Sequence, residues 1–345
     1  MNSTDQPRVL LIGLGAIGRA VGTRLVAVSH CRVVGAVDPA AGAGDLAAVV
    51  HGADPAARIV PALAEAPDAD VAFVATTSFV SEVEPIINAL LDRGLDVVTI
   101  CEQLGFGFFD HGPVARRIDA RARAAGRTVL GTGCNPGILL DTLPMLLSSL
   151  TTDVTGVTIR RTAEMSGYGG ILSKFGFGLT AAQFAAQREA GGVIGHVGFR
   201  ESVAALGEGL GWGLEEIVVD EPEPVLFTEH PRATPHLTLE EGTIAVLRHS
   251  ARGLVGGQVV IDAAIDFGIF ETADGFPEGD NWRIESGFQT LQFSSTRVDS
   301  YASTVAVAAN VIPSIPGAAP GLLTMADLPP KSFTPTAIVP HLAAH

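Results

Sequence analysis

A glycine-rich segment near the start of the chain has the spacing of a phosphate-binding turn. Gly13, Gly15 and Gly18 follow the apolar run RVLLI, and Asp38 comes about 20 residues after Gly18. Between a strand and a helix, such glycines allow a tight turn, a close approach of the backbone to a pyrophosphate, and packing of the helix on the strand. The N–H groups at the helix start favour phosphates. The pattern therefore predicts dinucleotide binding by Gly13, Leu14, Gly15, Ala16, Ile17 and Gly18, with a purely structural turn as the alternative.

Asp38 indicates which dinucleotide is preferred. Its carboxylate can accept hydrogen bonds from a ribose 2′-hydroxyl and would repel a 2′-phosphate. The residues that follow it, Pro39, Ala40 and Ala41, offer no cation. We therefore expect NAD to be preferred, and NADP stays the alternative because Arg19 lies close to the same turn.

Three predicted strands end in polar residues, and open parallel sheets bind ligands beyond the carboxyl ends of their strands. These ends are Thr76-Thr77-Ser78, Cys101-Glu102-Gln103 and Gly133-Cys134-Asn135-Pro136. Apart from the thiols, Glu102 is their only ionisable group, and burial beyond a strand would raise its pKa. We expect Thr76 and Thr77 to contact the cofactor, and Glu102 to be either an acid–base group or a structural carboxylate.

Other chemistries lack their usual residues. Lys174 and Lys331 are the only lysines, and neither Tyr168 nor Tyr301 has a lysine four positions later. The nine histidines show no metal-ligand spacing, so we expect no metal site and only surface or structural roles for them. A Cys134 thiolate beside a nicotinamide is one further alternative, although buried cysteines are commonly packing residues.

Alternating strand-like and helix-like segments must position these residues. Apolar runs predict strands at 8–13, 31–38, 57–63, 71–77, 95–100 and 127–132. Helices are predicted at 16–28, 81–94 and 113–126. This order predicts an α/β fold of the Rossmann type, with a doubly wound parallel sheet covered on both faces.

The pattern changes after residue 150. Alternation at 153–166 and the long stretch 243–270 predict a mixed or antiparallel sheet in a second α+β domain. Residues 300–315 predict a helix that packs back on the nucleotide domain, with Ala302, Ala306 and Ala309 on one face. We expect a dinucleotide-binding domain at 1–150, a substrate and dimerisation domain at 151–299, and a C-terminal helix and tail at 300–345.

The composition narrows the class of partners. The chain has 345 residues, 47% of them hydrophobic, which is enough for about two domains with their own cores. A net charge of −15 disfavours nucleic-acid binding, and no apolar run reaches the about 20 residues of a membrane span. The three cysteines form no close pair, so we expect a cytoplasmic protein without membrane association.

The order of several motifs resembles a known family. The chain contains, in this order, GLGAIGR, VAFVATTS, VVTICEQL, GTGCNPGILLDTLPMLLSSL, EMSGYG, GHVGFRES and AANVIPSIPGAAPGLLTMADLP. Together they resemble 2,4-diaminopentanoate dehydrogenase and the native amine dehydrogenases, which are similar in their N-terminal half to dihydrodipicolinate reductase. The paired histidines and lysine of that reductase are missing. The resemblance implies reversible oxidative deamination, in which a primary amine and NAD give a ketone or aldehyde and ammonia.

The resemblance also implies roles for particular residues. Glu102 would be the catalytic carboxylate that takes a proton from the alkylammonium and stabilises the iminium cation. Asn135 would orient the nicotinamide. Ile138, at the start of the next helix, would line the substrate cavity, and Tyr168 would close it from the second domain.

The substrate stays open at this point. Arg160 or Arg161 would pair with a substrate carboxylate, whereas Phe175 and Phe177 would suit an apolar amine. The resemblance further implies a homodimer, with the sheet of the middle domain as the candidate surface. The alternatives are 2,4-diaminopentanoate dehydrogenase proper, a dehydrogenase that oxidises alcohols or aldehydes on the same scaffold, and an NAD-binding sensor without catalysis.

Overall fold

The computed structural model describes residues 6–28, 31–277 and 279–333. By its internal contacts the chain divides into two compact units. The first unit comprises the residues up to Ile138 together with those from Tyr301 onward, and the second comprises Leu139–Ser300. The division therefore falls at Ile138 rather than after residue 150.

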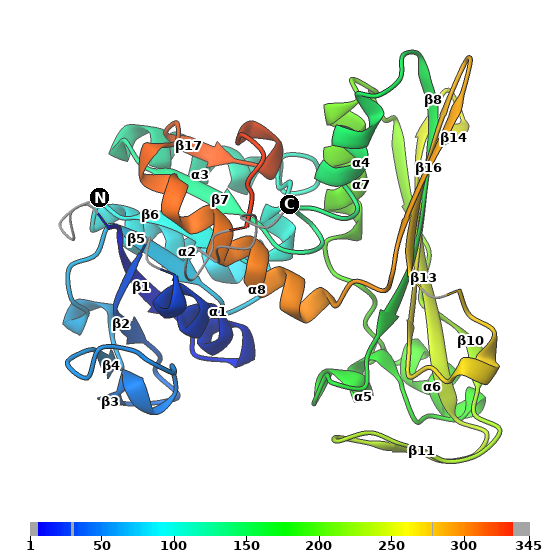
Figure 1. The fold of residues 1–345 in the computed structure, drawn as a ribbon, viewed down its shortest axis with the longest axis horizontal. Coiled ribbons are helices and arrows are strands. Elements are labelled where there is room, and N and C mark those ends of the chain that lie inside the picture. The colour runs from blue at the N-terminus through cyan, green and yellow to red at the C-terminus, as the bar shows by residue number, and fades with distance from the viewer. Residues whose placement is uncertain (1–5, 29–30, 278, 334–345) are drawn as a thin grey trace, which may run out of the picture. The chain divides into compact units, whose positions relative to one another are not determined.

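The first unit is built on a mostly parallel sheet with the strand order β17-β7-β6-β5-β1-β2-β4-β3 (Figure 1). The pairings are parallel except that of β3 with β4 at the edge. The strands are β1 (Arg8–Ile12), β2 (Arg32–Val37), β3 (Gly44–Asp45), β4 (Arg58–Val60), β5 (Val71–Val74), β6 (Asp96–Thr99), β7 (Thr128–Gly131) and β17 (Gly321–Leu323). The order reverses direction between β1 and β5, which is where such sheets bind ligands.

Helices cover both faces of this sheet, because successive strand residues point to opposite sides. The helices of this unit are α1 (Ala16–Ala27), α2 (Val80–Asp92), α3 (Gly112–Ala125) and α8 (Ser300–Val311). One apolar core joins α1 and α8 to the sheet, and a second joins α2 and α3 to its other face (Figure 1). The predicted doubly wound α/β architecture is confirmed.

Helix α8 buries a different face from the one that the alanines predict. Ala302 and Ala306 are exposed, so the expectation that Ala302, Ala306 and Ala309 together form a closely packed face is wrong. The helix instead buries its C-terminal end, where Ala308, Ala309 and Val311 enter the core. Small residues occur on all sides of this helix, and their pattern therefore does not specify one face.

The second unit is built on a mixed sheet with the strand order β10-β13-β14-β8-β15-β16, and β9 pairs with β13. The pair β8–β14 is parallel, and its other pairs are antiparallel. The strands are β8 (Val154–Glu164), β9 (Glu216–Val219), β10 (Glu223–Phe227), β13 (Ile244–Val255), β14 (Gln258–Gly268), β15 (Asp280–Ser286) and β16 (Thr290–Ser295), with β11 (Arg232–Ala233) and β12 (Thr238–Leu239) forming a separate pair. The predicted α+β class with a mixed sheet is confirmed.

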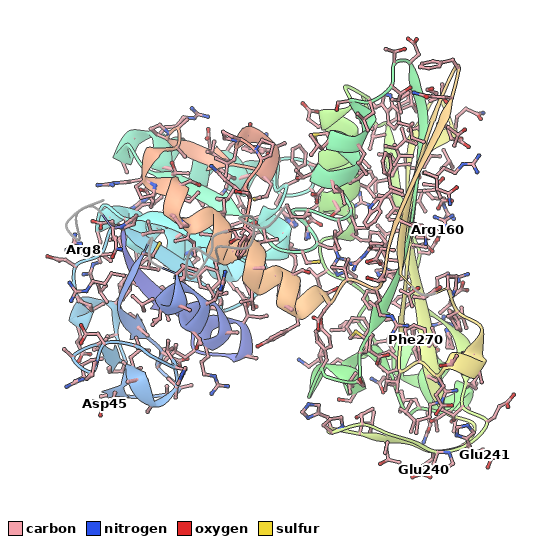
Figure 2. All side chains as sticks on the ribbon, in the orientation of Figure 1. Arg8, Asp45, Arg160, Glu240, Glu241 and Phe270 are labelled. Atoms are coloured by element: carbon pink, nitrogen blue, oxygen red, sulfur yellow. The ribbon has the colours of Figure 1, made fainter. Side chains whose placement is uncertain are left out.

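The two faces of this second sheet differ. Its helices are α4 (Thr142–Ser148), α5 (Ile171–Phe175), α6 (Ala181–Glu189) and α7 (Phe199–Gly209), of which α7 packs on β13 and α4 on β15. On β8, Ile159 and Arg161 are buried, whereas Arg160 between them is exposed and lies on the side away from α4 and α7 (Figure 2). Across the described residues, no helix has the length and apolar character needed to cross a membrane.

Candidate active site

The glycine turn between β1 and α1 has the geometry that dinucleotide binding requires. Gly13 has a φ of +89°, and a Cβ there would lie 2.7 Å from the Ala75 carbonyl oxygen. A Cβ at Gly18 would lie 2.0 Å from the Gly13 carbonyl oxygen, so the helix can start this close to the strand only with glycine. Around Gly15 nothing lies within 4 Å of the Cβ position, which leaves the backbone open to a phosphate.

Helix α1 begins at Ala16 without a side-chain cap. Gly15 is the N-cap residue, and the first turn, which includes Ile17, carries no acidic side chain that would compete with an anion. The Ala16 carbonyl accepts a hydrogen bond of 3.0 Å from the Tyr301 hydroxyl at the start of α8. The start of α1 is thus fixed by the C-terminal segment.

Asp38 follows β2 and is held by backbone donors. One carboxylate oxygen accepts from the Leu14 N–H at 2.7 Å, and the other accepts from the N–H groups of Ala40 and Ala41 at 2.8 and 3.1 Å. Burial alone would raise the pKa of Asp38, but these hydrogen bonds and the nearby Arg19 guanidinium outweigh it and lower the pKa. The carboxylate is therefore charged and fixed in place beside the glycine turn.

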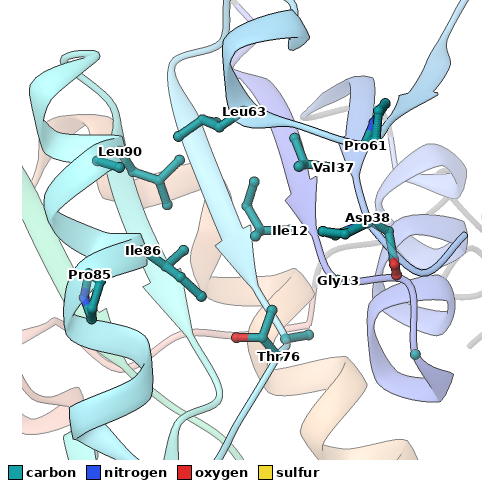
Figure 3. A pocket seen from close by; sticks show the side chains of 14 residues that line it. Ile12, Gly13, Val37, Asp38, Pro61, Leu63, Thr76, Pro85, Ile86 and Leu90 are labelled. Atoms are coloured by element: carbon teal, nitrogen blue, oxygen red, sulfur yellow. The ribbon is translucent and has the colours of Figure 1, made fainter. Parts of the chain in front are cut away.

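A pocket of about 630 Å³ lies next to Asp38 in the first unit (Figure 3). Its volume is in the range of small-molecule sites. The lining combines the strand ends with apolar side chains of α2: Ile12, Gly13, Gly15, Val37, Asp38, Pro39, Pro61, Leu63, Ala75, Thr76, Pro85, Ile86, Ala89 and Leu90. A flat apolar base would fit this lining beside the Asp38 carboxylate.

The two threonines predicted to contact the cofactor differ in position. Thr76 lines the pocket, with its methyl group 3.0 Å from the Cβ position of Gly13. The Thr77 hydroxyl accepts from the Phe79 N–H and donates to the Glu82 carboxylate at 2.5 Å. Thr77 is thus engaged at the start of α2, and its contact with a cofactor stays a prediction.

Glu102 opens a short 3₁₀ turn, Glu102–Leu104, directly after β6. The residue is half-buried, and this burial raises its pKa. The Ser78 hydroxyl and the backbone N–H of Glu102 hydrogen bond to the carboxylate and oppose that rise in pKa without cancelling it. No cation is among the causes that act on Glu102 from the described residues. A carboxylate of this kind can accept a proton near neutral pH.

Close backbone packing fixes this turn against the loop after β7. A Cβ at Gly131 would lie 2.1 Å from the Leu104 carbonyl oxygen, and one at Gly105 would lie 2.4 Å from the Pro136 side chain. Gly137 has a φ of +137°, and its Cβ would lie 2.4 Å from the Gly133 carbonyl oxygen. The glycines of GTGCNPG therefore serve to bring this loop onto the turn that carries Glu102.

The same loop positions Asn135 and Ile138. The Asn135–Pro136 peptide bond is cis, and Asn135 is half-buried in the loop after β7; its contact with a cofactor stays a prediction. Ile138 packs against the core of the first unit but does not begin a helix, because α4 starts at Thr142. The expectation of a helix starting at Ile138 is wrong: the N-cap is Asp141, which accepts from the Thr142 N–H.

The predicted substrate residues Tyr168, Phe175 and Phe177 belong to the second unit. Tyr168 lies in a turn after β8, where its N–H donates to the Met165 carbonyl at 2.9 Å. Phe175 and Phe177 are buried, and Phe175 packs edge-to-face against Phe267. The closing role of Tyr168 stays a prediction.

Neither arginine of the predicted pair is available without losing an ion pair. Arg160 contacts Asp262 at 2.5 Å on the exposed side of the sheet. Arg161 is 1% exposed in its side chain and contacts the fully buried Asp280 at 3.0 Å. Both therefore have structural partners.

Sequence reasoning gave no role to two residues beside Glu102. Ser78 and Gln103 belong to the polar strand ends TTS and CEQ. Their sequence positions indicate that they lie near the site but not what they contact. The Gln103 N–H donates to the Ser78 carbonyl at 3.3 Å, and the Ser78 hydroxyl acts to lower the pKa of Glu102.

Comparisons with known proteins agree with this geometry. A family model described as the 2,4-diaminopentanoate dehydrogenase C-terminal domain matches residues 138–343, which is more than half of the chain. The 2,4-diaminopentanoate dehydrogenase of Acetoanaerobium sticklandii is 28% identical over 333 residues, or 94% of each chain. The solved amine dehydrogenase of Mycobacterium smegmatis superposes with a TM-score of 0.82 at 20% identity and covers 96% of this chain and 99% of its own.

A more distant structural match supports the fold alone. GenD2 from gentamicin A biosynthesis, solved in complex with NAD, has a TM-score of 0.51 at 14% identity, over 85% of this chain and 74% of its own. The match to the family model decides membership, and the resemblance stated from the sequence is confirmed. The chain belongs to the 2,4-diaminopentanoate dehydrogenase family and is an NAD(P)-dependent oxidoreductase.

Proposed function

We propose that the protein is an NAD-preferring amine dehydrogenase that converts a primary amine reversibly into a ketone or aldehyde and ammonia. The observation that carries this proposal is Glu102, a half-buried carboxylate with a raised pKa on which no cation of the described residues acts. It follows β6 at the same edge of the parallel sheet as the glycine turn. The family's named relatives act on amines, which supports the same chemistry here.

The residues of the first unit fit a nicotinamide dinucleotide. The open space at Gly15 suits the pyrophosphate, Asp38 suits the ribose hydroxyls, and the pocket beside Thr76 suits the adenine. Asn135, on the loop packed against the Glu102 turn, would orient the nicotinamide. When bound, this group supplies the acceptor for a hydride from the carbon that bears the amine.

Glu102 performs the proton chemistry in this proposal. An alkylammonium holds its lone pair in an N–H bond, so it must lose a proton before the carbon can release hydride. The Glu102 carboxylate accepts that proton. Once Glu102 has passed that proton to solvent, its carboxylate is charged again and can stabilise the iminium cation that hydride loss forms. It can then accept a proton from the water that attacks the iminium. In the reverse direction the protonated acid assists loss of water from the carbinolamine.

We propose that NAD is preferred over NADP because of Asp38. Its charge is fixed by three backbone N–H groups, so a 2′-phosphate would meet a carboxylate that cannot easily turn away. Arg19 acts electrostatically on Asp38, and its positive charge would reduce the preference for NAD over NADP.

The ion pairs of the second unit favour a simple amine over an amino acid as the substrate. A substrate carboxylate would have to compete with Asp262 for Arg160 or with Asp280 for Arg161. Because the Arg161–Asp280 pair is buried, breaking it for a substrate carboxylate would cost about 3–5 kcal/mol of free energy. 2,4-Diaminopentanoate, the substrate in the relative's name, remains the second candidate.

The test is NADH oxidation with and without ammonia. We would screen aliphatic aldehydes, aliphatic and cyclic ketones, and 2-amino-4-oxopentanoate, with NADH and NADPH in parallel. We expect NADH consumption that depends on ammonia and amine as the product. Equal ketone reduction without ammonia would instead identify an alcohol dehydrogenase, and tight NADH binding without any turnover would favour a sensor.

We also propose a homodimer in which a second copy covers the outer face of the second sheet. This face carries ion pairs such as Arg160–Asp262 and Arg248–Asp266, beside a pocket of about 340 Å³. Light scattering should give twice the mass of 35.6 kDa, and Arg248→Glu should shift the protein toward the monomer. A monomeric wild-type protein at micromolar concentration would contradict the proposal.

A further inference from the structure

The first turns of α8 carry two hydroxyl groups that hydrogen bond to segments of the candidate dinucleotide site. The Tyr301 hydroxyl donates to the Ala16 carbonyl at 3.0 Å, and the Thr304 hydroxyl accepts from the Cys134 N–H at 3.2 Å. All four residues belong to the first unit. Because residues three positions apart are neighbours on the surface of a helix, one face of α8 contacts both segments.

The contact with Ala16 acts on the start of α1. The peptide group that contains the Ala16 carbonyl also contains the Ile17 N–H, which is one of the first N–H groups of this helix. Such N–H groups have no acceptor within a helix, and they favour an anion. A hydrogen bond to the peptide oxygen polarises the whole group and strengthens its N–H as a donor. Tyr301 therefore fixes and strengthens a donor close to Gly15, where the backbone is open to a phosphate.

The contact with Cys134 acts on the loop after β7. Cys134 directly precedes Asn135, the residue proposed to orient the nicotinamide. By accepting from the Cys134 N–H, the Thr304 hydroxyl holds the backbone one residue before Asn135. The loop is also packed closely within itself, since a Cβ at Gly137 would lie 2.4 Å from the Gly133 carbonyl oxygen. The backbone at Asn135 thus has little freedom to move.

The C-terminal end of α8 is anchored in a core that both segments reach. Ala308, Ala309 and Val311 are buried there with side chains of α1, and Ile17 and Ile138 pack against the same core (Figure 1). Close packing of this kind makes the helix a rigid support. The first turns of α8 can therefore hold the start of α1 and the loop after β7 at a set separation.

We propose that α8 forms part of the dinucleotide site, and that Tyr301 and Thr304 are positioning residues for the cofactor. Tyr301 directs a donor of α1 at the pyrophosphate, and Thr304 holds Asn135 beside the nicotinamide. The proposal rests on the proposed dinucleotide site of the first unit. Because each hydroxyl serves a different part of the cofactor, a ligand that lacks the nicotinamide can separate their effects.

The first test measures ligand binding by Tyr301→Phe, which removes the hydroxyl and keeps the ring. NADH contains the pyrophosphate and the nicotinamide, whereas ADP-ribose contains the pyrophosphate alone. We expect both ligands to bind about fivefold more weakly, as the loss of one neutral hydrogen bond predicts. Isothermal titration calorimetry measures both dissociation constants. In amine oxidation, KM for NAD should rise by a similar factor while kcat stays near the wild-type value.

The second test uses Thr304→Val, which keeps the shape and removes the hydroxyl. We expect NADH to bind about fivefold more weakly and ADP-ribose to bind as in the wild type, because ADP-ribose has no nicotinamide for Asn135 to orient. Thr304→Ser keeps the hydroxyl and should restore NADH binding. The matched control is Ser314→Ala, since the Ser314 hydroxyl donates to the Val311 carbonyl within the same C-terminal segment, at 2.7 Å. Both ligands should bind this variant as they bind the wild type.

The outcomes separate this inference from the proposed site. Thermal unfolding of each variant checks that the fold is retained. Wild-type affinity for both ligands in Tyr301→Phe would overturn the role of Tyr301. In Thr304→Val, an unchanged affinity for NADH, or an equal loss for NADH and ADP-ribose, would overturn the role of Thr304. A wild-type protein that binds neither ligand would instead overturn the proposed dinucleotide site itself.

Discussion

Two carboxylates, one in each unit, are withdrawn from water in opposite ways. Asp280, fully buried in the second unit, contacts Arg161 through both oxygens, at 3.0 and 3.3 Å, and accepts from the Val298 N–H at 3.1 Å. Glu102 in the first unit has the Ser78 hydroxyl and its own backbone N–H, and burial raises its pKa. A buried charge with a cation serves the fold, whereas one without a cation is available for proton transfer. The matching amide substitutions, Asp280→Asn and Glu102→Gln, can test this contrast.

The largest effect should come from Asp280→Asn. The change keeps the shape but leaves the Arg161 guanidinium buried without its counter-charge, which costs about 3–5 kcal/mol of unfolding free energy. Urea denaturation measures it. A loss below 1 kcal/mol would mean that Arg161 finds water or another acceptor, and the stabilising half of the comparison would fail.

Glu102→Gln should affect chemistry rather than stability. We expect at least a 100-fold loss in the rate of amine oxidation, about 2.7 kcal/mol of barrier, with NADH binding retained. Single-turnover kinetics and NADH fluorescence titration separate the two quantities. A variant with both wild-type rate and wild-type affinity would show that Glu102 is a structural carboxylate.

The same variant predicts a pH dependence of stability. Because the pKa of Glu102 is higher in the folded than in the unfolded chain, the folded state binds more protons between these two values. Glu102 therefore lowers the free energy of unfolding as pH rises from about 4.3 through the folded pKa. The difference in Tm between Glu102→Gln and wild type should grow in favour of the variant over that range. A constant difference would show that the carboxylate is well solvated.

The environment of Asp38 is intermediate between those of Asp280 and Glu102, because backbone N–H groups rather than a paired cation hold its carboxylate. Asp38→Ala removes the repulsion toward a 2′-phosphate, and we expect the ratio of kcat/KM for NAD over NADP to fall about tenfold. Asp38→Asn is the matched control, because it keeps the shape while removing the charge. An unchanged ratio in both would mean that Asp38 supports the turn without reading the ribose.

Local patterns predicted the first unit better than the second. The strands around β1 and β6 are short apolar runs that end in glycine or polar residues, and helix α3 is followed by Gly126, which has a φ of +62°. The ends of these elements can therefore be predicted from residues next to them in the sequence. Strand β15 was missed because NWRIES has weak alternation and pairs with β8, more than a hundred residues earlier. Such pairing depends on distant parts of the chain.

The features of the candidate site also differ in how well the sequence predicts them. Gly13, Asp38 and Glu102 could be found from their positions at strand ends. The link between Ser78 and Glu102 could not be predicted, because it depends on two loops meeting in space.

The sequence predicted surface or structural roles for the histidines, with their polar atoms either exposed or hydrogen-bonded. The Nε2 atom of His196 is instead buried without a hydrogen-bond partner in the described part of the chain, and burial lowers the pKa of this residue to about 3.

The smallest effect should come from Asp262→Asn, the control for Asp280→Asn. The two carboxylates each pair with one of two adjacent arginines on β8, but the side chains of Arg160 and Asp262 are 47% and 37% exposed. Water and salt screen such a pair, so we expect its loss to cost no more than about 1 kcal/mol. Urea denaturation at low and high salt checks this. Arg160 and Arg161 are neighbours on β8 but point to opposite faces of the sheet. If Asp262→Asn and Asp280→Asn lowered the free energy of unfolding equally, burial would not explain how much each ion pair stabilises the fold.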